Sequence, residues 1–306
     1  MKKQLLIAAV AATMTSVAMA DISISGGAKV NYLYTDNDTG ANSNVFKHDI
    51  DLTVAGKTGD TGVVMTVSNA QSNNDTDAES ALTVENSYVT SKIGDVNVKM
   101  GQWAKTSDSL LTDHKTTYES GRLSLDTTVG GVKIQFEDYN AGNSRTTVSG
   151  EVAGVKLAHT IYQTETDTKV KANVAGVSID YRLRDRDAAD TNTSSLQLDK
   201  EFNGMTFTYA NIDTDTGATA VSADAYIAGS GIKEADAFGV SMPLAGNVVQ
   251  VKRIAITDSL GEDKSTKLYL TRKLASGATF EAIYTDTDNA TTTDTATLDL
   301  ELAVKF

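Results

Sequence analysis

Basic side chains recur at alternate positions between residues 121 and 186. In the segment 177–186, Tyr181 and Leu183 alternate with Arg182 and Arg184. Successive side chains of a β-strand point to opposite faces, so the pattern predicts cations on one face of a sheet. The cations so placed are Arg122, Lys133, Arg145, Lys156, Lys169, Lys171, Arg182, Arg184 and Arg186. Neighbouring like charges repel, so we expect acids among them, and Glu137, Glu151 and Asp180 fall on the same faces. The cations either contact a solute or form an ion-pair lattice that only keeps this face polar.

The sequence does not favour catalysis. The chain has no cysteine, which excludes a thiolate nucleophile, a disulfide scaffold and a cysteine-type zinc site. Of the three histidines, His48 and His159 are predicted on the apolar face of their strands. His114 follows Asp113, and adjacent residues do not easily form a base with its orienting acid. We therefore predict no enzyme, no catalytic residue, no cofactor and no bound metal.

Acidic residues exceed basic ones, and the net charge is −13. This balance argues against a nucleic-acid partner, which requires a basic surface. Short acidic stretches recur at 165–167, 213–215 and 285–288. They lack the fixed spacing and glycine hinge of a calcium-binding loop, so a hydrated surface is the preferred interpretation. Divalent cations that bridge these stretches to anionic lipopolysaccharide are the alternative.

The first twenty residues have the pattern of a secretory signal peptide. Lys2 and Lys3 precede a mostly apolar stretch, and Ala18-Met19-Ala20 supplies small residues before a cleavage point at Asp21. The apolar stretch is too short for a membrane-spanning helix. We therefore divide the chain into a signal peptide, 1–20, and one domain, 21–306, that leaves the cytoplasm.

The mature chain alternates apolar and polar residues from end to end. At its C-terminus, Leu298, Leu300 and Leu302 alternate with Asp299 and Glu301, and the pattern continues to Phe306. The first mature segment, 22–34, alternates in the same way. Runs of about ten such residues are typical of tilted transmembrane β-strands, whereas a soluble sandwich needs only five or six. The pattern predicts an all-β, transmembrane antiparallel β-barrel.

Two kinds of connection take turns along the chain. The short ones centre on glycine, as in Ala153-Gly154 and Asn203-Gly204, and predict tight hairpins. The eight short turns lie at 55–62, 93–96, 129–132, 152–155, 174–177, 202–205, 243–247 and 275–277. The others are longer and rich in Asp, Thr, Asn and Ser. Eight short turns predict about eighteen strands, or sixteen if one segment is not a strand, with both termini on the short-turn side. A barrel of this size is too wide for side chains to fill.

One connection differs in composition. The segment from Lys99 to Glu119 contains Trp103, Leu110 and Tyr118, which a solvated loop does not need. We expect this third long loop to fold into the lumen and narrow it. Its acids would then face a basic wall across the constriction. The predicted constriction residues are Asp108, Asp113 and Glu119 on the loop, and Arg122, Lys133, Arg145, Lys156, Arg182, Arg184 and Arg186 on the wall.

On these features the chain resembles Gram-negative general porins. The signal peptide, the first strand, the segment Val98–Gln102 before the third loop, and Phe306 as the final residue carry the resemblance. The Pro-Glu-Phe-Gly segment of enterobacterial porins is absent from the third loop, and the family is usually sixteen-stranded. The resemblance implies an outer-membrane location among lipid and lipopolysaccharide, a homotrimer, and recognition of Phe306 by the barrel-assembly machinery.

The resemblance also implies passive diffusion of small hydrophilic solutes and ions, and the acidic loops favour a weak cation preference. One alternative is a substrate-selective channel of similar fold, with inward aromatics predicted at Tyr139, Tyr162 and Tyr269. A different alternative is a secreted β-rich surface adhesin. We further expect interfacial aromatic girdles. Their members would be Tyr32, Tyr34, Tyr88, Tyr209, Phe280 and Tyr284.

Overall fold

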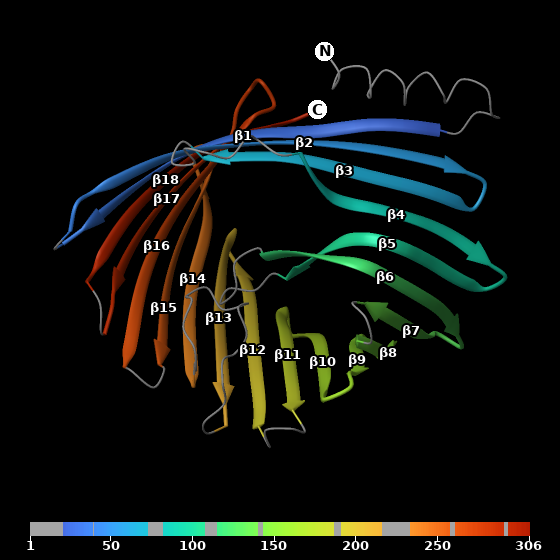
Figure 1. The fold of residues 1–306 in the computed structure, drawn as a ribbon. Coiled ribbons are helices and arrows are strands. Elements are labelled where there is room, and N and C mark those ends of the chain that lie inside the picture. The colour runs from blue at the N-terminus through green and yellow to red at the C-terminus, as the bar shows by residue number, and fades with distance from the viewer. Residues whose placement is uncertain are drawn as a thin grey trace, which may run out of the picture.

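The computed structural model describes residues 21–38, 40–72, 82–107, 115–139, 143–186, 191–215, 233–257, 261–290 and 293–306. The predicted signal peptide, 1–20, lies outside these ranges. Within them, no helix is long and apolar enough to cross a membrane. Eighteen β-strands make up the fold (Figure 1).

The strands are β1 (Asp21–Asn37), β2 (Ser43–Thr58), β3 (Thr61–Ser72), β4 (Thr83–Ile93), β5 (Val96–Ser107), β6 (Lys115–Val129), β7 (Val132–Tyr139), β8 (Asn143–Val152), β9 (Val155–Ile161), β10 (Glu165–Val174), β11 (Val177–Arg186), β12 (Thr191–Phe202), β13 (Met205–Thr214), β14 (Glu234–Leu244), β15 (Asn247–Thr257), β16 (Glu262–Lys273), β17 (Thr279–Asp288) and β18 (Thr295–Lys305).

These strands form one closed antiparallel sheet. Each strand pairs with its neighbours in sequence, and β1 also pairs with β18, from Gly27 opposite Lys305 to Asn37 opposite Thr295. Closure leaves no unpaired sheet edge, which is the condition for crossing an apolar bilayer with strands. The predicted barrel is confirmed, and eighteen is the correct strand number.

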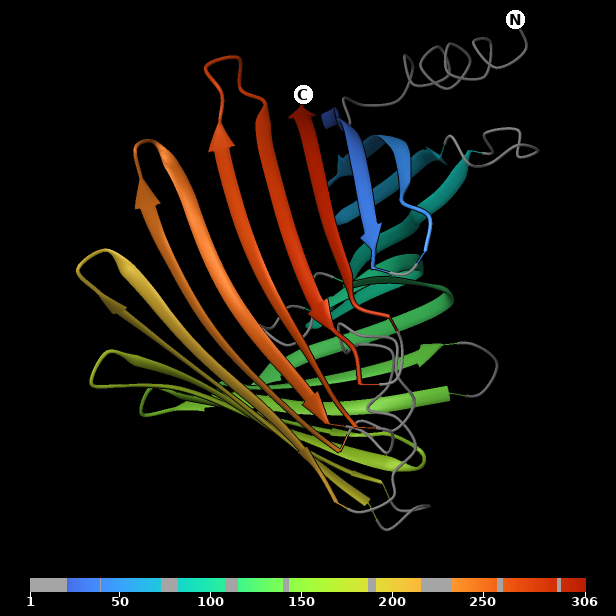
Figure 2. The same cartoon turned by 90° about the vertical axis from the view of Figure 1, so that its left-hand side faces the viewer.

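The eight short turns lie where the sequence predicts them. Figure 2 shows three of them, β12–β13, β14–β15 and β16–β17, at the same end of the barrel. Four turns place a non-glycine residue at positive φ directly before a glycine: Ala153, Ala175, Asn203 and Ala245, with φ of 50° to 52°. Primed two-residue turns need this backbone conformation, so they explain the glycine-centred pattern. The sequence pattern does not mark the connection between Tyr139 and Asn143.

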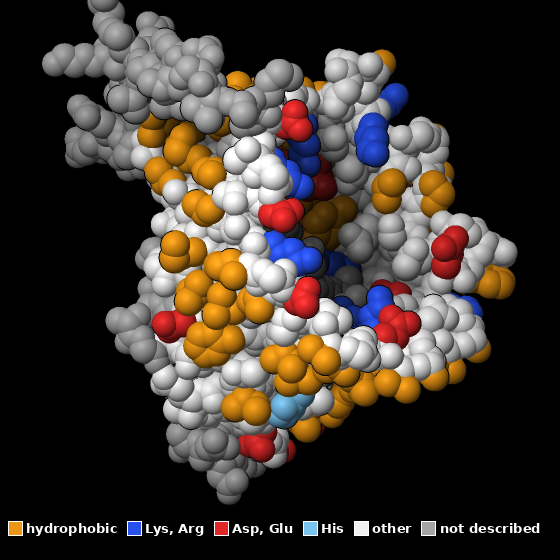
Figure 3. Space-filling model, turned by 90° about the vertical axis from the view of Figure 1, so that its right-hand side faces the viewer, with side chains coloured by type: hydrophobic (Ala, Val, Ile, Leu, Met, Phe, Trp, Pro, Cys, Tyr) orange, Lys and Arg blue, Asp and Glu red, His pale blue; other side chains and the backbone are white. Residues whose placement is uncertain are grey.

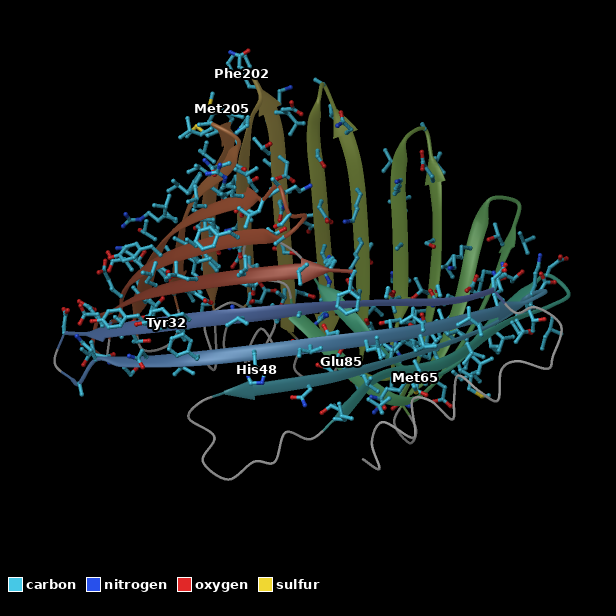
Figure 4. All side chains as sticks on the ribbon, turned by 90° about the horizontal axis from the view of Figure 1, so that it is seen from above. Tyr32, His48, Met65, Glu85, Phe202 and Met205 are labelled. Carbon is cyan, nitrogen blue, oxygen red and sulfur yellow. The ribbon has the colours of Figure 1, made fainter. Side chains whose placement is uncertain are left out.

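Apolar side chains alternate onto the outer face of the barrel. Ile24 is 66% exposed and Val30 52% exposed, whereas the intervening Asn31 donates to acids of β18 on the inner face. Figure 4 shows Tyr32, His48 and Met65 along β1, β2 and β3, and Phe202 and Met205 at the β12–β13 turn. The outer face also carries two cross-strand aromatic pairs. The ring centroids are 4.9 Å apart for Tyr32–Phe46 and 5.0 Å apart for Tyr209–Phe238.

The predicted third loop is largely a β-hairpin. β5 and β6 pair from Asn97 opposite Asp126 to Ser107 opposite Lys115. The prediction that Glu119 belongs to an inserted loop is therefore wrong, because this residue lies in β6 opposite Trp103. The aromatic residues of this segment suggested a packed loop, but such residues also favour strands. Asp108 and Asp113, the other predicted loop acids, lie outside the described residues.

The backbone conformation of the tight turns predicts how substitutions there change the free energy of unfolding. Outside glycine and asparagine, a left-handed conformation costs about 1 kcal/mol. Ala153→Asn should therefore raise the free energy of unfolding by a few tenths to about 1 kcal/mol. Asn203→Ala should lower it by a similar amount, and urea unfolding of the barrel in lipid vesicles measures both. Equal stability of both variants and the parent would contradict the assigned turn geometry.

Candidate functional site

The inner face of the barrel carries charged side chains of both signs. Figure 3 shows a hollow bordered by basic and acidic side chains, with hydrophobic side chains gathered outside it. The cations of β5–β11 are called the basic wall here. The basic wall comprises Lys99, Arg122, Lys133, Arg145, Lys156, Lys169, Lys171, Arg182 and Arg184. What distinguishes its members is whether an acid lies beside them.

One carboxylate holds two buried arginines. Arg122 Nη2 lies 2.8 Å from Glu137 Oε1, and Arg145 Nε lies 2.5 Å from Glu137 Oε2. The side chains are only 2% (Arg122), 10% (Arg145) and 8% (Glu137) exposed. The triad carries one net positive charge on the inner wall. Its geometry satisfies a general rule, since buried charges are retained only when they are paired and hydrogen-bonded.

Further along the wall, other cations are also neutralised. Arg182 donates from Nη2 to Asp167 Oδ2 at 2.6 Å and from Nε to Oδ1 at 2.9 Å. Three further ion pairs accompany this bidentate one: Arg184–Glu165 at 3.7 Å, Lys133–Asp126 at 3.4 Å and Lys171–Asp180 at 2.5 Å. The ion-pair lattice considered from the sequence is therefore present for most of the predicted wall.

Lys99 is different, because it is held by aromatic rings. Its Nζ lies 3.8 Å from the ring centroid of Tyr88 and 4.5 Å from that of Trp103. Arg122 stacks on the same indole, with Cζ 4.2 Å from the centroid. In the part of the chain that the structure describes, Lys99 forms no ion pair. Cation–π contacts of this kind contribute about 0.5–2 kcal/mol each and leave the positive charge uncompensated.

A β-bulge in β6 lies beside these groups. Ser120 and Gly121 of β6 face the single residue Gln102 of β5, and the register shifts between Gly101 and Trp103. Gly101 has a φ of 135°, and a Cβ there would overlap the carbonyl oxygen of Ser87 on β4. Bulges re-aim side chains locally. The extra residue lies on β6, so Lys99 and Trp103 share one face of β5 by simple alternation, and Trp103, only 7% exposed, contacts both Lys99 and Arg122 beside the bulge.

Acids line a different sector of the inner face, on β17, β18 and β2. Asn31 Nδ2 donates to Glu301 at 3.0 Å, Thr271 to Glu281 at 3.0 Å, and Ser68 to Asp49 at 2.8 Å. The same sector includes Asp51 and Asp299, and Lys29 lies 3.5 Å from Asp49. Among the described side chains, acids therefore outnumber cations in this sector, whereas cations outnumber acids along the basic wall. Sequence reasoning missed this acidic sector, although the alternation Asp299–Glu301 was its visible signal.

A third sector of the inner face, on β15 and β16, is buried. Lys252 and Lys267 lie directly opposite each other and are each 5% exposed, and Lys252 Nζ is 5.2 Å from the ring centroid of Tyr269. Next to them, Ile254 is fully buried. The prediction that Tyr269 and Tyr162 face inward fits their contacts with Lys252 and Arg145.

The remaining predicted residues have varied outcomes. Lys156 is exposed and, like Lys169, has no ion pair among the described residues. For Arg186 only the backbone is described, opposite Glu165. Tyr88 was predicted in a lipid-facing girdle, and this is wrong because its ring contacts Lys99 and Trp103. The β4–β5 pairing places its side chain with Lys99 on the inner face.

This architecture defines a class: the chain has the fold of a bacterial outer-membrane β-barrel channel. No family model matches the chain, and no curated protein matches it in sequence. Solved structures, in contrast, match the chain in fold. OccK3 (OpdO) of Pseudomonas aeruginosa aligns with a TM-score of 0.72 at 11% identity, over 94% of this chain and 96% of that one. OccAB4 of Acinetobacter baumannii aligns with a TM-score of 0.70 at 10% identity, over 93% and 98%.

A third neighbour is P. aeruginosa OpdK, solved with vanillate, with a TM-score of 0.67 at 10% identity, over 93% of this chain and 98% of that one. The eighteen strands of the described chain differ from the sixteen that are usual in the general porins it resembles in sequence. At these identities the likeness establishes the fold.

Glu137 offers a test of the buried triad. Glu137→Gln would leave two nearly buried guanidinium groups without a carboxylate, and should lower the free energy of unfolding by about 3–5 kcal/mol. The control is Asp180→Asn, which breaks an exposed ion pair and should cost about 1 kcal/mol or less. Urea unfolding in vesicles compares the two variants. Equal, small losses would mean that Glu137 is solvated.

Proposed function

We propose that this protein is an outer-membrane diffusion channel selective for small organic anions. The observation that carries the proposal is Lys99, a cation on the inner wall that is held between Tyr88 and Trp103 and has no ion pair among the described residues. Most arginines of the basic wall already have carboxylate partners. Lys99 retains its charge for a solute, and aromatic side chains flank it.

The chemistry of such a site suits a planar carboxylate. The ammonium group of Lys99 attracts the carboxylate, while the rings of Tyr88 and Trp103 supply apolar surface for an aryl group. Arg122 adds positive potential from the other side of the bulge, 4.2 Å from the indole centroid. Lys156 and Lys169, which form no ion pair within the described ranges, extend the positive charge along the wall, so that an anion has further positions to occupy.

The structural neighbours support a selective channel over a general one. One of them, OpdK, was solved with vanillate, an aromatic carboxylate. The rival interpretation is a general porin with a weak cation preference, as the acidic loops suggested. It requires a constriction loop with Asp108, Asp113 and Glu119, whereas Glu119 lies in β6. The proposed location is the outer membrane. A homotrimer, contact with lipopolysaccharide and recognition of Phe306 by the assembly machinery stay predictions.

Planar-bilayer recording tests the proposal. In about 0.1 M KCl, where charges are only partly screened, vanillate should reduce the single-channel current in a saturable manner. Lys99→Met should raise the half-blocking concentration about three- to tenfold, because the positive charge that attracts the carboxylate is lost. The uncharged vanillyl alcohol should not block either protein.

The matched control is Lys156→Met, which removes a lysine from the same wall without touching the aromatic rings. It should change the half-blocking concentration less than Lys99→Met does. Conductance that vanillate does not block would instead favour a general porin, whose cation preference the reversal potential in a KCl gradient would reveal. Purified protein that produces no conductance steps would refute any channel function.

A further inference from the structure

The seam between the first and last strands ends in a tight backbone pair. Beyond the register of β1 and β18, the Gly26 amide donates to the Phe306 oxygen at 2.8 Å, and the Phe306 amide donates to the Gly26 oxygen at 3.0 Å. The final residue of the chain is thus fully incorporated into the ladder. Figure 2 shows the end of β18 beside β1.

The ring of Phe306 lies directly on Gly26. A Cβ built on Gly26 would lie 2.7 Å from Cζ and 2.8 Å from Cε2 of Phe306, closer than real Cβ atoms approach other atoms. It would also lie 2.5 Å from the carbonyl oxygen of Asp51 on β2. The ring therefore occupies the space that any other residue at position 26 would fill.

The position on the outer face explains this arrangement. Gly26 shares the face of Ile24 and Ala28, and Phe306 shares the face of Leu302 and Val304. A glycine in a strand leaves its backbone uncovered, and an aromatic side chain across the ladder can cover it. The ring remains 67% exposed, so one face contacts Gly26 while the other faces the surroundings.

We propose that Gly26 is an intramolecular binding site for the C-terminal phenylalanine ring, and that this contact latches the closed barrel. The contact links the first strand to the last residue, so it forms only when β1 and β18 pair. It stabilises the closed barrel over an open sheet with two free edges. The channel function does not enter this inference, which would stand if the channel proposal failed.

A double-mutant cycle tests the latch, using full-length mature protein unfolded in urea and refolded into lipid vesicles. The four proteins are the parent, Gly26→Ala, Phe306→Ala and the double variant. Closure is read from the mobility of unboiled protein in detergent gels, and folding from the fluorescence of the single tryptophan. Gly26→Ala should lower the folding equilibrium constant about three- to tenfold more with Phe306 than with alanine at position 306, because only the former loses an aromatic contact.

The Asp51 carbonyl contact is the same in both backgrounds, so it cancels in the cycle. Gly56→Ala is the matched control: Gly56 lies on the outer face of β2 near the same end, and nothing lies within 4 Å of a Cβ there. This variant should fold like the parent. If Phe306→Ala does not refold, Phe306→Leu replaces it, since leucine retains an apolar side chain without the ring. An equal effect of Gly26→Ala in both backgrounds would overturn the latch.

Discussion

Closure of the hydrogen-bonded ladder is the constraint on which the rest of this structure depends. In an apolar bilayer an unsatisfied backbone amide or carbonyl costs several kcal/mol, so a membrane-crossing sheet cannot keep a free edge. The chain meets this condition by pairing β1 with β18 along its length and through Gly26 and Phe306 at the end. Tight glycine-centred turns at one end preserve the ladder, because each strand returns directly beside the one before it.

A closed ladder gives every strand one face toward lipid and one toward the lumen, and the lumen then has to accommodate charge. The structure does so mainly by pairing: Glu137 holds Arg122 and Arg145, and Asp167 holds Arg182. These pairs account for the basic residues that the alternation made conspicuous. Lys99 is the cation best placed to bind a solute. It is less conspicuous in the sequence, because two aromatic rings hold it and not an acid. The part of the basic wall around Lys99 therefore differs from the rest by a positive charge that no described acid compensates, and not by the number of its cations.

Local features of the fold could be predicted from the sequence, whereas contacts that depend on register could not. The turns at Ala153-Gly154 and Asn203-Gly204 follow from backbone preferences of adjacent residues, and the strands follow from alternation. The Tyr88–Lys99–Trp103 cluster depends on the β4–β5 register, in which Tyr88 pairs with Gly101 and so shares a face with Lys99, and the prediction of Tyr88 in a girdle missed this pairing. Composition also misled at Trp103 and Tyr118, which read as a packed loop but lie in paired strands. The resemblance to general porins predicted the outer-membrane barrel correctly, although that family usually has sixteen strands and this barrel has eighteen.

Register connects the seam to the proposed site. In an antiparallel sheet a shift of one residue moves every side chain of a strand to the other face. Each strand is aligned only by its neighbours, so closure at β1 and β18 restricts the registers of the whole ring, including that of β5 against β6. The Gly101–Trp103 shift is tolerated because Gly101 and Gly121 adopt positive φ there, at 135° and 67°. Without a closed ring, the register of β5 against β6, which brings Trp103 beside Arg122, would be less restricted. The position of Lys99 in the lumen is therefore a consequence of how the barrel ends meet.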